Sequence, residues 1–142
     1  DHFRQISIEG KQFVVGGTVF VPVYSHIRVE GGRAPLTTNL TIHNTDFKKP
    51  IIVTSLRFFD HSGKLLRDYL DEAHSLEPMG AAEFFVEPSR SYSETALNFV
   101  LEWRSEEPVS EPVIEAVMAN QSGTHGLAFV TTGRTIAGLP EK

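Results

Sequence analysis

The sequence predicts an all-β fold, an antiparallel β-sandwich of about seven to nine strands. The first observation is that short segments rich in β-branched and aromatic residues alternate between polar and apolar positions, as half-buried strands do. The second is that turn residues separate these segments roughly every ten positions, a spacing typical of sandwiches rather than of alternating strands and helices. Residues 64–70 also fit one face of a helix, and we interpret them as a strand.

The longest regular pattern covers residues 36–60, which we predict to be a hairpin of two strands. In the first strand, residues 36–44, one face is mainly apolar and the other is polar, so we expect one face to be buried. Asn44-Thr45-Asp46 provides side chains that start a turn. The second strand, residues 51–60, is expected to place four side chains on a common face: Ile52, Thr54, Leu56 and Phe58.

The remaining predicted strands are shorter. In chain order they cover residues 18–24, 26–30, 64–70, 82–87, 96–103, 113–120 and 127–134. Pro22 cannot donate a backbone hydrogen bond, so the first of these strands is expected at a sheet edge or at a bulge. Gly16-Gly17 is expected to break the chain before it. The loops and turns between the strands are expected at residues 31–35, 88–95, 105–112 and 121–126.

The length of 142 residues fits one domain. We expect residues 1–17 to form an N-terminal arm or hairpin, residues 18–136 the sandwich domain, and residues 137–142 a tail. The chain begins at Asp1 rather than at methionine, which is compatible with the removal of a leader or a tag.

The composition excludes several classes of function. Cysteine is absent, which excludes disulfides, thiolate metal sites and a cysteine nucleophile. The net charge is −5 and no basic run is present, which argues against nucleic acid as a partner. No apolar run approaches the length of a membrane span.

The six histidines are the candidates for a metal site, because without cysteine a zinc or copper ion would need histidine and carboxylate ligands. None of them forms a closely spaced metal-binding pair, so only the fold can bring them together. The favoured interpretation is that each is a surface or hydrogen-bonded histidine and that the protein has no cofactor. The alternative is a zinc or copper site built from some of His26, His43, His61 and His125.

Catalytic patterns are weak. Ser25 and His26 are adjacent, but neighbours on a strand point to opposite faces, so we expect their side chains to diverge. The glutamates of residues 102–115 are interpreted as a solvated acidic loop rather than as a paired acid and base. Trp103 is interpreted as a core residue, with ligand stacking as the alternative.

Four segments together resemble a family of small bacterial proteins known only as a domain of unknown function. These segments are VPVYSHI at 21–27, LTIHNTD at 40–46, NFVLEWR at 98–104 and IEAVM at 114–118. The resemblance implies an exported, periplasmic or lipid-anchored protein with no established activity. The strand and turn plan is also similar to immunoglobulin-like bacterial domains, an analogy of fold alone.

These observations predict a non-enzymatic extracytoplasmic module that binds a cell-envelope protein or a small ligand through loops or an exposed sheet edge. Because Tyr24 and His26 lie in a segment that carries the resemblance, they are the first choice for the binding patch, together with Trp103. An exposed edge would also support a homodimer, although Pro22 at that edge would prevent such pairing.

Overall fold

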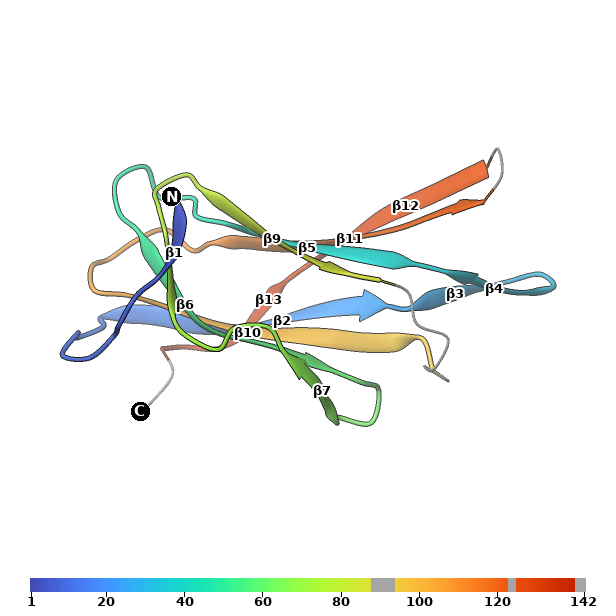
Figure 1. Ribbon diagram of the computed structural model, residues 1–142, viewed down its shortest axis with the longest axis horizontal. Helices are drawn as coiled ribbons and strands as arrows, with labels where there is room; N and C mark the ends of the chain where they lie inside the picture. The colour runs from blue at the N-terminus through green and yellow to red at the C-terminus, as the bar shows by residue number, and fades with distance from the viewer. Residues whose placement is uncertain (88–93, 123–124, 140–142) are drawn as a thin grey trace.

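The computed structural model describes residues 1–87, 94–122 and 125–139, and within them the chain forms thirteen strands and no helix (Figure 1). The expectation of an all-β, antiparallel, sandwich-like fold is confirmed, although the strands outnumber the predicted seven to nine. The strands are β1 (Phe3–Gln5), β2 (Val15–Tyr24), β3 (His26–Val29), β4 (Gly32–Pro35), β5 (Thr37–His43), β6 (Ile51–Phe59), β7 (Leu65–Asp68), β8 (His74–Leu76), β9 (Ala81–Val86), β10 (Ala96–Ser105), β11 (Val113–Ser122), β12 (His125–Thr132) and β13 (Arg134–Ala137).

Two sheets form the layers of the sandwich. The larger has the order β1-β8-β6-β10-β2-β13, with β7 also paired to β6, and the smaller has the order β12-β11-β5-β9. In Figure 1 the smaller sheet lies above the larger one, and the β3–β4 ribbon extends away from both. Alternate side chains of both sheets fill the core, and Phe99, Trp103 and Leu40 are among its fully buried members.

The prediction that residues 36–60 form a hairpin is wrong, because β5 and β6 belong to different sheets. Residues 44–50 cross from one layer to the other, so the apolar faces of β5 and β6 meet across the core instead of side by side. The buried side chain of Asn44 holds this crossing: its Nδ2 donates to the carbonyl oxygens of Lys49 at 2.9 Å and Leu76 at 3.1 Å.

The common face predicted for the second strand of that segment is also interrupted. The ladder between β6 and β10 shifts register between Glu102 and Trp103, which is a β-bulge opposite residues 53–55. Leu56 and Phe58 therefore point into the core as predicted, but Val53 is buried and Thr54 is half-buried.

The prediction that Gly16-Gly17 breaks the chain before the strand is wrong, because both glycines lie inside β2. A Cβ at Gly16 would lie 2.5 Å from the carbonyl oxygen of Trp103, and one at Gly17 would lie 3.1 Å from Trp103 Nε1. The two glycines are therefore needed because β10 and its tryptophan approach β2 closely.

Two predicted loops are strands instead. Residues 31–35 contain β4, which pairs with β3 in a tight ribbon, because Gly31 and Gly32 both take positive φ at its turn. Residues 121–126 contain the end of β11 and the start of β12, and residues 123–124 lie outside the described residues. The loop predicted at 88–95 falls largely on residues 88–93, which also lie outside them.

The predicted last strand, residues 127–134, is divided at Gly133 into β12 and β13, which belong to different sheets. The Gly133 N–H donates to Ile114 O at 2.7 Å, and a Cβ there would lie 2.8 Å from a methyl group of Val19. The chain thus crosses to the larger sheet through a position that only glycine fits. Among the described residues, β13 pairs with β2 only beside residues 18–20, so no strand pairs with β2 on that side at Pro22, as predicted for an edge; the Pro22 carbonyl oxygen accepts from Thr131 Oγ1 at 2.6 Å instead.

Candidate functional site

The candidate site is a groove of about 490 Å³ at the side of the sandwich, between β9 of the smaller sheet and β7 of the larger one. Its walls come from two chain segments, 58–69 and 85–87. The residues that line it are Phe58, Leu66, Arg67, Tyr69, Phe85, Val86 and Glu87. A concave surface with aromatic walls and a few charged groups is the usual form of a binding site. We name this surface the aromatic groove.

Tyr69 is the fixed wall of the aromatic groove. Its ring centroid lies 5.6 Å from that of Phe99 and 6.3 Å from that of Phe58, both of which are buried in the core. The guanidinium carbon of Arg67 lies over the Tyr69 ring, 4.4 Å from its centre. Ring contacts to the core and to Phe84 of β9, together with the cation over the ring, therefore hold Tyr69 in place at the groove.

Phe85, on β9, also lines the groove and is 57% exposed, which makes it one of the most exposed large apolar side chains in the described residues. A single exposed apolar side chain is common on protein surfaces, so the significance of Phe85 comes from its place in the lining of the groove. Its position follows from the sequence. Phe84 and Phe85 are neighbours on one strand, so only one of them can point into the core, and Phe84 takes that place.

β9 is the terminal strand of the smaller sheet in the described part of the chain. The N-terminal arm covers one end of its free side: His2 Nε2 donates to Ala81 O at 2.8 Å, and the Phe3 ring lies 6.2 Å from Phe84. The other end of β9, at Phe85 and Val86, adjoins the aromatic groove. Within the described residues, the groove therefore lies at the end of this sheet edge that the N-terminal arm does not cover.

A second polar cluster lies where β2 meets β3. Contrary to the expectation that their side chains diverge, Ser25 Oγ lies 2.9 Å from His26 Nδ1. A bend at Ser25 between the two strands interrupts the alternation, so the two side chains turn toward each other and both are buried. Arg33 Nη1 lies 3.2 Å from His26 Nε2.

The direction of these hydrogen bonds fixes the chemistry of the cluster. Arginine can only donate, so His26 Nε2 accepts from Arg33 and the proton of the neutral ring sits on Nδ1. That Nδ1–H donates to Ser25 Oγ, whose own hydroxyl donates to the carbonyl oxygen of Glu94 at 3.4 Å. A serine nucleophile needs the reverse, a histidine nitrogen that accepts its proton. The arrangement braces a strand junction rather than activating Ser25.

Burial lowers the pKa of His26 below its ordinary value, and the positive charges of Arg33 and Arg28 lower it further, whereas Glu94 acts in the opposite direction. The neutral ring is therefore the form that this junction stabilises.

The structure separates the histidines proposed as metal ligands. His43 pairs with one end of β11 at Val113, and His125 pairs with the other end at Ser122. His61 lies exposed in the turn after β6, and His26 lies buried at the β2–β3 junction. Within residues 1–87, 94–122 and 125–139, no three side chains of the metal-binding types come close enough to share an ion.

The other predicted patch residues lie apart from each other. Trp103 is 1% exposed and belongs to the core, so its indole is not at the surface. Tyr24 is half-buried, and its ring lies 6.2 Å from that of Phe129 on β12. Sequence reasoning did not single out Tyr69, Arg67 or Phe85. The adjacent pair Phe84-Phe85 was a signal for Phe85, because alternation on a strand forces one of the two rings outward, but it gives no signal for Tyr69 or Arg67.

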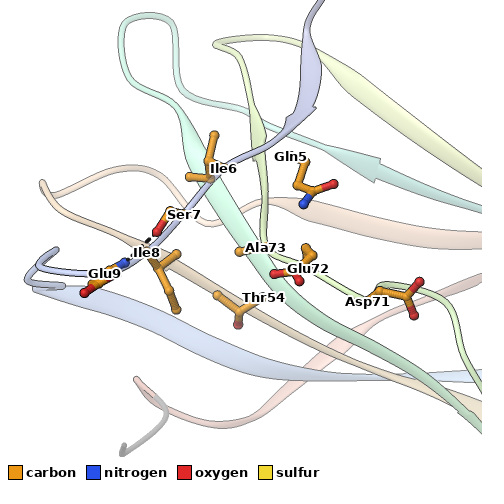
Figure 2. A pocket seen from close by; sticks show the side chains of 9 residues that line it. All are labelled: Gln5, Ile6, Ser7, Ile8, Glu9, Thr54, Asp71, Glu72 and Ala73. Atoms are coloured by element: carbon orange, nitrogen blue, oxygen red, sulfur yellow. Dashed lines mark hydrogen bonds between the residues drawn. The ribbon is translucent and has the colours of Figure 1, made fainter.

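A second groove, of about 640 Å³, lies between the N-terminal arm, β6 and the segment before β8 (Figure 2). Its lining is mixed, with Ile6 and Ile8 beside the carboxylates of Glu9, Asp71 and Glu72. In Figure 2 Asp71 and Glu9 lie at opposite ends of the groove, so the carboxylates do not converge. A backbone hydrogen bond from Ile6 N–H to Ala73 O at 2.9 Å joins two of its walls and continues the pairing of β1 with β8.

A family model described as "Protein of unknown function (DUF3124)" matches residues 16–136, from β2 to β13. The chain belongs to the DUF3124 family. Every residue that lines the aromatic groove lies within the DUF3124 segment, whereas residues 5–9 of the second groove lie outside it.

The crystal structure of Thermotoga maritima 1070 is similar in fold, with a TM-score of 0.52 and 13% sequence identity. The similarity covers 86% of this chain and 96% of that chain, and at this identity it concerns the fold alone. No curated protein matches the chain. The described residues contain no helix that is long and apolar enough to cross a membrane.

Proposed function

We propose that this DUF3124 protein is a non-enzymatic, extracytoplasmic binding module that captures a polypeptide segment of a cell-envelope protein in the aromatic groove. The observation that carries the proposal is the groove itself, which is lined by Tyr69, held by ring contacts to Phe58 and Phe99, and by the exposed Phe85, beside the outermost described strand of the smaller sheet. The resemblance of four segments to exported bacterial proteins supports the extracytoplasmic location, and the strand and turn plan supports the immunoglobulin-like character of the sandwich.

The arrangement of the polar side chains supports a binding function rather than catalysis. The Ser25–His26 pair has its proton on the wrong nitrogen for a nucleophile, and the carboxylates of the second groove do not converge. The aromatic groove offers large apolar contact area with two charged side chains, Arg67 and Glu87, at positions that orient a bound chain.

The test is a selection of linear peptides from a random display library, followed by titration of a selected peptide into ¹⁵N-labelled protein. We expect amide shifts to concentrate at the aromatic groove and Tyr69→Ala to weaken binding by about tenfold or more, because a buried aromatic contact is lost. The matched control is Tyr24→Ala, which removes a half-buried aromatic ring outside the groove. Failure to select any peptide, or shifts that map elsewhere, would overturn the proposal.

A further inference from the structure

We infer that the bound segment adds to β9 as an extra antiparallel or parallel strand, through the backbone groups of Glu83 and Phe85, and that it carries basic residues beside an apolar one. This inference rests on the proposed function and specifies the partner's conformation and charge.

The first step is the orientation of the backbone of β9. Gly80 O accepts from the N–H of Asn44 at 2.9 Å, on the β5 side, whereas Ala81 O accepts from the His2 side chain, on the free side. In an antiparallel ladder, successive residues direct their N–H and C=O to opposite neighbours. Continuing this alternation from Gly80, the residues whose N–H and C=O face β5 are Ala82, Phe84 and Val86, which lie opposite Ile42, Leu40 and Thr38 in the register.

The second step follows from the same alternation. Glu83 and Phe85 direct their N–H and C=O groups away from β5, toward the free side of β9. Among the residues that the structure describes, the free-side carbonyl that accepts a side-chain hydrogen bond is that of Ala81, from His2. Two successive free-side residues present two donors and two acceptors, which is the requirement for adding a strand.

The third step concerns the side chains of an added strand. Successive residues would point alternately into the aromatic groove and toward the outer face of the smaller sheet. On that outer face Glu83 and Phe85 lie on β9, and Glu87 follows in the same alternation, so an exposed aromatic ring stands between two exposed carboxylates. Charge complementarity therefore favours a partner with lysine or arginine on either side of an apolar residue.

The same charges disfavour a second copy of this chain as the occupant. Two β9 strands paired antiparallel about Phe85 would set Glu83 of one copy directly opposite Glu87 of the other. Like charges directly opposite on paired strands are destabilising. A basic segment of a different protein relieves the repulsion that a second copy would create.

The experiment compares Glu83→Pro with Glu83→Ala, using a peptide selected from the display library. Both substitutions remove the carboxylate and its hydrogen bond from Asn39 Nδ2 at 3.3 Å, but only proline removes the free-side N–H. Proline is tolerated at an edge position whose N–H faces solvent, and thermal unfolding of both variants checks the fold. We expect proline to weaken peptide binding about tenfold relative to alanine, because a backbone hydrogen bond is lost and the ring blocks the edge.

A scan of N-methylated peptide positions provides the measurement that does not depend on the folding of the proline variant. Strand addition predicts that loss of affinity recurs at every second position. The inference is overturned if Glu83→Pro and Glu83→Ala bind the peptide equally and the scan shows no two-residue period. In that case, amide shifts centred on the aromatic groove would still support the proposed function. Selection of no peptide overturns both, and selected peptides with acidic rather than basic residues overturn the charge assignment.

Discussion

The chemistry of single residues shows how far neighbours in sequence can mislead. Ser25 and His26 were expected to diverge, because alternation holds along a continuous strand. The bend between β2 and β3 interrupts that alternation, and no residue type in the segment predicts the bend. Trp103, in contrast, is buried as its place among alternating apolar residues predicts. Periodicity therefore predicts burial inside strands and fails at their junctions.

His26 leads to a prediction of pH dependence. Because its pKa in the folded protein lies below the ordinary value of 6.5, protonation favours the unfolded chain. The stability that neutral His26 contributes is present above that value and is lost as the pH falls below it, through the lower pKa of the folded state. We expect His26→Gln, which keeps a neutral donor and acceptor, to lose less stability than the wild type between about pH 7.5 and about pH 5.5.

Urea denaturation of both proteins at the two pH values measures this effect. For each protein, the measured quantity is the change in the free energy of unfolding between the two pH values. Subtracting one change from the other cancels the contributions that are common to both proteins. Equal changes in the free energy of unfolding for the wild type and His26→Gln would contradict the assignment of a stabilised neutral ring.

At the scale of elements, the strands were predictable and their partners were not. The alternation in residues 36–44 and 96–103 correctly located β5 and β10. The hairpin predicted from β5 to β6 was wrong because a short connection is compatible with pairing in one sheet and with crossing between two. What decides the crossing is the buried Asn44 and its long-range bond to Leu76, which sequence spacing cannot show.

The glycines of β2 provide a test at this scale. Gly16→Ala would place a Cβ 2.5 Å from the backbone oxygen of Trp103, so β2 and β10 must move apart. We expect this substitution to lower the free energy of unfolding by about 1–3 kcal/mol, the usual cost of overpacking. Chemical denaturation measures it, with Gly138→Ala as the control, since a Cβ at Gly138 would meet nothing within 4 Å. Equal stability of the two variants would show that the close approach of β2 and β10 is not a constraint.

At the scale of the whole molecule, the aromatic groove is formed by residues of both sheets, and neither sheet forms it alone. Tyr69 follows β7 of the larger sheet and Phe85 lies on β9 of the smaller one, and only their packing forms the aromatic groove. The fold class and most strand positions were predictable from alternation. The site was not, because it depends on which strand ends each sheet. The net charge of −5 and the flanking glutamates of β9 agree with a basic partner.

Amide hydrogen exchange along β9, measured by NMR with and without a selected basic peptide, tests this account most directly. In the free protein we expect slow exchange at Ala82, Phe84 and Val86, which face β5, and fast exchange at Glu83 and Phe85. The peptide should slow exchange at Glu83 and Phe85. Slow exchange at these two amides in the free protein, or fast exchange that persists with peptide bound, would contradict an accessible edge that captures a strand.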